Sequence, residues 1–159
     1  MKIIGSYPKT RLRRLRKSEW IRNLVTENSI TNNDLILPIF ITDGRNKIET
    51  IKSMPGIKRY TIDKLPTILN QVKKYKIPMV AIFPYTPDNK KDNLGSEALN
   101  PNNLICRAIK LIKKKFKGIG IMCDVALDPY TSHGHDGIFI KDKIDNDETI
   151  KILVKQALL

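Results

Sequence analysis

The chain has 159 residues, of which 41% are hydrophobic and 28% are charged. These proportions are typical of a globular domain and exclude a disordered or fibrous protein, and no apolar run approaches the ~18 residues that span a bilayer. The two cysteines, Cys106 and Cys123, form no CxxC pair, so a disulfide-bonded scaffold is excluded and a cytoplasmic location without membrane attachment is expected.

The formal net charge of +13 comes from two short segments of the chain. Residues 1–25 contain eight basic residues and one acidic residue, and residues 98–123 contain six basic residues and no acidic one. Aromatic side chains are not interleaved with either segment, because Trp20 and Phe116 are isolated and lie on apolar faces. The charge therefore favours solvated faces and a basic arm, or an acidic partner, over nucleic-acid binding.

A basic arm followed by a short helix is predicted for residues 1–33. The arginines of the arm are Arg11, Arg13, Arg14 and Arg16. Ser18 is a candidate N-cap with an acidic residue directly after it. The apolar residues that follow at helical spacing are Trp20, Ile21, Leu24 and Val25. This pattern predicts an amphipathic helix beginning near Ser18.

Strand and helix patterns alternate over residues 34–159. Apolar runs that predict buried strands cover residues 35–41, 79–83 and 119–125. Helices are predicted over residues 63–76, from about 101 to 117, and from 146 onward. Residues 42–60 contain turn signals at Asp43-Gly44 and Pro55-Gly56. Asp63 is the expected cap of the helix that follows, and Pro38 favours an outer or irregular strand. The order predicts an α/β fold with parallel strands joined by right-handed crossovers.

The final helix carries a long apolar stripe and then the sequence stops. Its members are Ile150, Leu153, Val154, Ala157 and Leu158. No glycine cap, turn or strand follows before Leu159, and 159 residues fall short of the roughly 200 or more that a closed eight-stranded α/β barrel needs. We expect the chain to be an incomplete one.

The residues best suited to chemistry follow the third predicted strand. Segment 124–137 contains three carboxylates and two imidazoles at the carboxyl end of a parallel strand, where sites collect in α/β folds. Asp124 is expected to be partly desolvated, and it could accept a hydrogen bond from an ammonium or hydroxyl group of a ligand or cap nearby backbone N–H groups. We leave both roles open for Asp124.

A metal site is a second possible use of the same segment. Asp128 and Asp136, with His133 and His135, could collect a cation, and their oxygens suit Mg²⁺ or Mn²⁺ better than Zn²⁺. A His-Gly-His turn is equally compatible with a purely structural role. Spacing alone does not decide between these two interpretations.

Five ordered motifs resemble those of one enzyme family. They are RLRRLR from Arg11, SEWIRNL from Ser18, DLILPIF from Asp34, SMPG from Ser53, and DVALDPYTSHGHDG from Asp124. Together they are similar to the N-terminal half of δ-aminolevulinic acid dehydratase, also called porphobilinogen synthase. The resemblance implies the first part of a TIM (β/α)8 barrel behind an N-terminal arm, with residues 34–159 forming the first three β/α units of a truncated barrel.

The resemblance also implies a reaction and an assembly. Members of the family are lyases of porphyrin and haem biosynthesis that condense two molecules of 5-aminolevulinate into porphobilinogen with loss of two waters. Their N-terminal arm embraces a neighbouring subunit, commonly in a homo-octamer, which assigns the arm arginines to an intersubunit contact. The alternative is a non-catalytic module that docks on a full-length subunit or on an acidic partner.

Site residues follow from the resemblance as expectations. Asp124 would lie in the substrate pocket, with Asp128 and Asp136 on the loop beside it. Zinc-dependent members carry cysteines where this chain has Ala126, Asp128 and Asp136, so the resemblance implies Mg²⁺ or a monovalent cation rather than zinc. The two lysines that form Schiff bases with substrate belong to later strands, beyond Leu159. We therefore assign no catalytic residue to the chain, and we expect it to be inactive alone.

Overall fold

The computed structural model describes residues 5–159. These residues form two compact units, which meet between Thr31 and Asn32 in the sequence. The boundary predicted from the sequence follows residue 33. The first unit contains a short 3₁₀ turn, Arg14–Arg16, and helix α1, Glu19–Leu24. Ser18 occupies the N-cap position of α1, as predicted, although its side chain donates and accepts no capping hydrogen bond. None of the described residues of this unit is buried.

The second unit is built on a five-stranded sheet with the order β2-β3-β1-β4-β5. Its strands are β1 (Ile36–Thr42), β2 (Ile48–Thr50), β3 (Lys58–Thr61), β4 (Met79–Pro84) and β5 (Gly120–Cys123). Strands β1, β4 and β5 are the three predicted from the apolar runs, and they pair in parallel, with Ile36 opposite Met79 and Met79 opposite Gly120. The predicted parallel α/β arrangement is confirmed.

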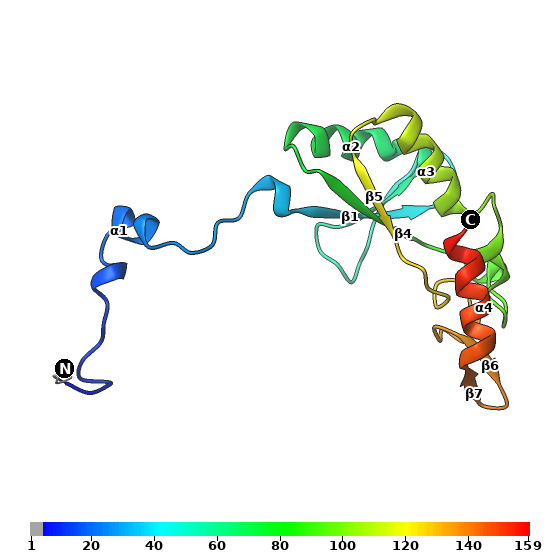
Figure 1. The fold of residues 1–159 in the computed structure, drawn as a ribbon. Coiled ribbons are helices and arrows are strands. Elements are labelled where there is room, and N and C mark those ends of the chain that lie inside the picture. Colours follow the sequence, from blue (N-terminus) through cyan, green and yellow to red (C-terminus); the bar gives the residue numbers. More distant parts are fainter. Residues whose placement is uncertain (1–4) are drawn as a thin grey trace. The chain divides into compact units, whose positions relative to one another are not determined.

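Two helices connect these parallel strands and cover one face of the sheet. They are α2 (Leu65–Lys74) and α3 (Leu104–Lys115), and both are drawn on the same side of the sheet in Figure 1. Their apolar stripes and the inward side chains of the strands form one core, whose fully buried members include Ile39, Ile82, Leu69 and Ile112. Burial of each such side chain contributes about 1.5–3 kcal/mol, so this layer stabilises the sheet that carries the site.

Residues 42–60, for which the sequence predicts turns and no strand, contain strand β2 and most of strand β3. β2 runs antiparallel to β3, with Ile48 opposite Tyr60, and β3 runs parallel to the end of β1. Both strands are too short to produce a readable alternation. The Pro55-Gly56 turn between them is as predicted: Gly56 has φ +82°, and the Ile57 N–H donates to the Met54 carbonyl at 3.0 Å.

Pro38 lies in β1, the central strand, so its predicted outer position is wrong. The Ile41 carbonyl accepts a hydrogen bond from the Tyr85 N–H at 2.8 Å, on the β4 side. Backbone groups alternate sides along a strand, so those of Pro38 point toward β3. β3 pairs only with Phe40–Thr42. The missing N–H of Pro38 therefore removes no ladder hydrogen bond.

Asp63 does not cap α2, contrary to prediction. A 3₁₀ turn, Ile62–Lys64, precedes the helix, and Lys64 holds the N-cap position. Both carboxylate oxygens of Asp63 instead accept from the Asn46 N–H, at 3.0 and 3.1 Å. Asp63 therefore fixes the β1–β2 loop, while the proline in the first turn of α2 is tolerated as predicted.

A β-hairpin and helix α4 complete the second unit. The hairpin consists of β6 (Ile138–Ile140) and β7 (Lys143–Asp145), and α4 spans Asn146–Ala157. The hairpin escaped prediction because Lys141 and Asp142, not glycine or asparagine, occupy the two turn positions, with φ +48° and +60°. Helix α4 begins where predicted, because Asp145 accepts from the Glu148 N–H at 3.0 Å.

The apolar stripe predicted for α4 is only partly buried. Leu153 packs with its neighbour Ile152 against the loop that follows β5. Ile150, Val154 and Leu158 remain 49%, 53% and 82% exposed. None of the helices in residues 5–159 is long and apolar enough to cross a membrane.

Candidate functional site

Segment 124–137 leaves the sheet at the carboxyl end of β5, as predicted. The strand ends at Cys123, so Asp124 is the first residue beyond it rather than a strand residue. Its side chain is exposed, which contradicts the expected desolvation. Asp124 lines a hollow of 240 Å³ together with Cys106, Tyr130 and Gln156. This carboxylate is therefore accessible to a small molecule.

Buried apolar side chains anchor the segment. Leu127 is 0% exposed and packs with Ala98, Tyr130 and Ile138 in a second hydrophobic cluster. Burial raises the pKa of the Tyr130 hydroxyl, which keeps that hydroxyl neutral. The carboxylates of the segment therefore project from a fixed backbone.

The carboxylates of Asp128 and Asp136 differ in their surroundings. Asp136 Oδ1 accepts from the Leu127 N–H at 2.6 Å and closes the loop on itself. Partial burial, and then the negative charges of Asp136 and Asp124, raise the pKa of Asp128. The negative charges of Asp124 and Asp136 therefore reach the Asp128 carboxyl.

The structure does not assemble the four-residue metal set that the sequence suggested. Across residues 5–159, no three His, Cys, Asp or Glu side chains converge closely enough to hold a metal ion. His133 and His135 stack on each other with ring centroids 5.4 Å apart, and both lie against Phe139. The two histidine rings of the His-Gly-His turn therefore pack on the hairpin through Phe139.

The loop that follows β4 meets segment 124–137 at Asp92. The Asp92 N–H donates to the Tyr130 carbonyl at 3.3 Å, and the Asp92 carbonyl accepts from the Ser132 N–H at 2.9 Å. Asp92 Oδ1 accepts from the N–H groups of Leu94 and Ser96, and the Ser96 hydrogen bond lowers the pKa of this carboxyl. The sequence analysis did not predict this junction, because its two loops are far apart in the sequence and no local pattern links them.

A second polar group that sequence reasoning missed lies where β1 ends. Asp43 accepts from Lys90 Nζ at 2.7 Å and from Arg107 at 2.7 Å. These hydrogen bonds, that of Lys90 first, lower the pKa of Asp43. Glu97 lies 3.9 Å from Lys90. The signal in the sequence was the pair Asp43-Gly44 directly after a strand, which we took only as a turn.

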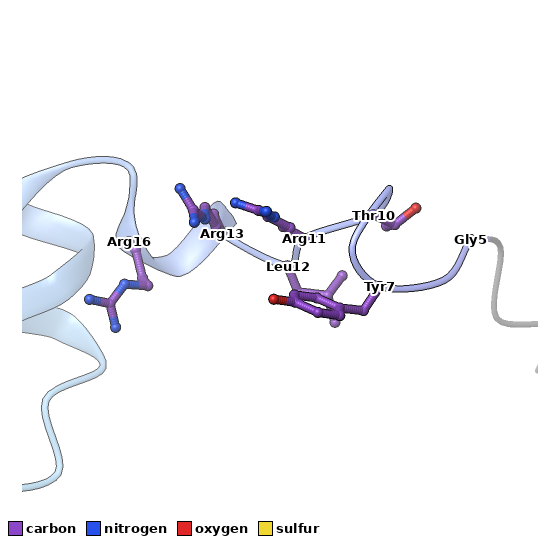
Figure 2. A pocket seen from close by; sticks show the side chains of 7 residues that line it. All are labelled: Gly5, Tyr7, Thr10, Arg11, Leu12, Arg13 and Arg16. Carbon is purple, nitrogen blue, oxygen red and sulfur yellow. The ribbon is translucent and has the colours of Figure 1, made fainter.

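The arm presents arginines and apolar side chains together to solvent. A groove of 570 Å³ is lined by Tyr7, Leu12, Arg11, Arg13 and Arg16. Figure 2 shows these side chains. The Arg11 guanidinium carbon lies 5.8 Å from the centre of the Tyr7 ring. Among the exposed apolar side chains of this unit, Leu12 is 96% exposed, Trp20 67% and Leu24 77%.

Comparison with known proteins identifies the family. The family model described as Delta-aminolevulinic acid dehydratase matches residues 9–159. The chain belongs to the delta-aminolevulinic acid dehydratase family. It is 53% identical over 149 residues to the Delta-aminolevulinic acid dehydratase of Bradyrhizobium diazoefficiens, and 42% identical over 149 residues to that of Chlamydia pneumoniae. These alignments cover 94% of this chain but 42% and 45% of those relatives, so the chain spans less than half their length.

A solved member of the delta-aminolevulinic acid dehydratase family has the same fold. The crystal structure of the Toxoplasma gondii ME49 enzyme, in complex with the reaction product porphobilinogen, superposes with a TM-score of 0.88 at 38% identity. The match covers 94% of this chain and 43% of that one. The parallel βα units therefore form part of the family's TIM barrel, and the strands of residues 5–159 do not close it.

Proposed function

We propose that this chain supplies the arm, the first three β/α units and the acidic loop, residues 124–137, of a porphobilinogen synthase. The reaction is the condensation of two 5-aminolevulinate molecules to porphobilinogen with loss of two waters. The family match over residues 9–159 carries this proposal. Both cysteines are unpaired, which suits the reducing cytoplasm as its location.

Asp124 has the position and charge to bind substrate. Its exposed carboxylate borders the 240 Å³ hollow at the end of β5. The amino group of 5-aminolevulinate is an ammonium near neutral pH, and a carboxylate accepts a strong, charge-assisted hydrogen bond from such a donor. We assign Asp124 to substrate orientation.

The chain lacks a suitable Schiff-base amine among its described residues. Such a lysine needs a pKa lowered by burial or by a neighbouring cation. No lysine between residues 5 and 159 is buried; Lys141 and Lys143 lie in the hairpin and Lys155 on the exposed side of α4. We propose that the reacting amines come from sequence outside these residues.

A cation would act at the acidic loop. Asp128 and Asp136 offer the oxygen donors that Mg²⁺ prefers, and Ala126 cannot supply a zinc-binding thiolate. When bound, such an ion offsets the mutual repulsion of the carboxylates. Because no three ligands converge in residues 5–159, waters or residues from elsewhere must complete its coordination.

A chimera tests the proposed function. In the Bradyrhizobium diazoefficiens relative, the matching segment is replaced by this chain and pyrrole formation from 5-aminolevulinate is assayed. We expect activity in the chimera, and a loss of about a hundredfold in its Asp124→Asn variant, since substrate orientation commonly contributes on this order. The matched control is Asp88→Asn, because the Asp88 side chain is 99% exposed and its ion pair is with Lys91, outside segment 124–137. A folded chimera without activity contradicts the proposal.

The arm favours a protein partner, which we propose to be a neighbouring subunit in an octamer. Its exposed apolar side chains resemble an interface more than a solvated surface. In the chimera, replacing Arg11, Arg13, Arg14 and Arg16 by glutamate is expected to lower the mass of the assembly measured by light scattering.

The matched control is the same change at Lys110, Lys113, Lys114 and Lys115, which alters the charge equally on the solvated face of α3. Assembly that survives reversal of the arm charges, or that is lost equally in the control, contradicts the arm contact.

A further inference from the structure

We propose that Asp92 is a positioning residue whose carboxylate shapes the turn that holds the acidic loop in place. Asp92 lies in the loop after β4 and begins the turn formed by residues 92–96. The catalytic meaning of this role rests on the proposed function, because the acidic loop carries Asp124. Its structural meaning rests on contacts within the chain.

One oxygen of the Asp92 carboxylate closes the turn on itself. Asp92 Oδ1 accepts from the Leu94 N–H at 2.9 Å and from the Ser96 N–H at 3.0 Å. Gly95, between these two donors, has φ +63°, a conformation that glycine adopts without strain. An aspartate side chain that accepts from N–H groups two or more residues ahead fixes a turn that belongs to no helix or sheet. The carboxylate therefore determines the course of residues 92–96.

The backbone at the start of the turn pairs with the acidic loop. Asp92 lies opposite Thr131 in an isolated parallel β-bridge. The Asp92 N–H donates to the Tyr130 carbonyl at 3.3 Å, and the Asp92 carbonyl accepts from the Ser132 N–H at 2.9 Å. Ser132 Oγ also donates to Asn93 Oδ1 at 2.5 Å. Because both backbone groups of Asp92 are hydrogen-bonded to the acidic loop, the loop follows the position of the turn.

Apolar contacts extend this junction toward the carboxylates of the loop. A Cβ atom at Gly95 would lie 3.5 Å from Leu127 Cδ2 and from Thr131 Cγ2, so the turn packs closely on these side chains. Ala98, just after the turn, is 0% exposed and packs with Leu127. Leu127 directly precedes Asp128 in the sequence. The turn therefore supports the part of the acidic loop from which Asp128 projects.

Amide hydrogen exchange in the full chain tests whether Asp92 holds the acidic loop. In Asp92→Ala, we expect the protection factors of the Ser132 and Leu127 N–H groups to fall about tenfold, the effect of losing one hydrogen bond, while protection in β4 stays unchanged. Asp92→Asn keeps an acceptor oxygen at the same place, so its protection is expected to match that of wild type. The matched control is Asp88→Ala in the same loop, because the Asp88 side chain is 99% exposed.

Three results of the exchange experiment would overturn the proposal. Unchanged Ser132 protection in Asp92→Ala would mean that the acidic loop does not depend on the turn. An equal fall in β4 would mean that the substitution destabilises the whole unit. An Asp92→Asn variant that behaves like Asp92→Ala would mean that the acceptor oxygen is not what holds the turn.

Turnover by the chimera with the Bradyrhizobium diazoefficiens relative tests the catalytic role. We expect Asp92→Ala to lower kcat about tenfold, because a displaced loop misorients the substrate, and Asp92→Asn to stay within about twofold of the unsubstituted chimera. In the Asp124→Asn background, Asp92→Ala is expected to cost less than about threefold, because residues that act through one another have non-additive effects. Equal losses in the two backgrounds, or an unchanged kcat in Asp92→Ala, would overturn this role.

The exchange experiment separates a failure of this proposal from a failure of the proposed function. An inactive unsubstituted chimera would contradict the proposed function, and exchange in the full chain would still decide whether Asp92 holds the acidic loop. Unchanged exchange in Asp92→Ala, together with an active chimera, would remove the role of Asp92 and leave the proposed function intact.

Discussion

Replacing Leu127 by alanine is expected to lower the free energy of unfolding of the second unit by about 2–5 kcal/mol, the range for a fully buried leucine. Leu127 is 0% exposed and packs in one cluster with Tyr130 and Ile138. Its N–H also holds Asp136. The cavity that Leu127→Ala leaves therefore weakens both the attachment of the acidic loop to the unit and the packing of that loop against α4.

The measurement is urea denaturation followed by far-ultraviolet circular dichroism. Tryptophan fluorescence does not report on this unit, because the single tryptophan, Trp20, lies in the arm. The control is Val125→Ala in the same segment, where the side chain is 43% exposed and the expected cost is below about 0.5 kcal/mol. Equal effects of the two substitutions would contradict the anchoring role of Leu127.

Asp43→Asn is expected to cost about 1–2 kcal/mol near neutral pH, a value reduced for the partial exposure of its ion pairs. The change removes the negative partner of Lys90 and Arg107, each 2.7 Å away. Arg107 then loses its carboxylate partner, although its buried Nε has no hydrogen-bond partner even before the substitution. Asp88→Asn is the control, because Asp88 is 99% exposed and its pair with Lys91 is expected to contribute little.

The contribution of Asp43 depends on pH in a defined direction. Its folded pKa lies below the ordinary value of 3.8 because Lys90 and Arg107 hydrogen-bond to the carboxylate. The stabilisation is therefore complete above about pH 4 and is lost as the pH falls through the lowered pKa. The stability difference between wild type and Asp43→Asn should shrink in acid. A difference that grows in acid, or none at neutral pH, would contradict the ion-pair account.

The sequence predicted the elements whose signals are long and periodic. The apolar runs that became β1, β4 and β5, and the apolar stripes of α2 and α3, can be recognised from residue spacing, because these strands and helices bury their apolar side chains in one shared core. Strands β2, β3, β6 and β7 have three or four residues each, too few to show a period.

Contacts between distant loops accounted for most of the unpredicted features of the site. The sequence located segment 124–137 at the end of a strand, but not the junction of Asp92 with Ser132 or the pairing of Asp43 with Arg107. Both join residues about 40 or more positions apart, which no local pattern encodes. Asp124 was expected inside a strand because the apolar run continues to Val125, whereas the pairing with β4 ends at Cys123.

The central claim is that this chain binds and orients substrate while the reacting amines lie outside its described residues. Borohydride reduction in the presence of 5-aminolevulinate tests it directly, because it traps a Schiff base as a stable adduct that mass spectrometry locates. The account predicts no adduct on the isolated chain, and in the chimera an adduct only on a lysine of the Bradyrhizobium diazoefficiens portion. A specific, substrate-saturable adduct on any lysine between residues 5 and 159 would contradict it.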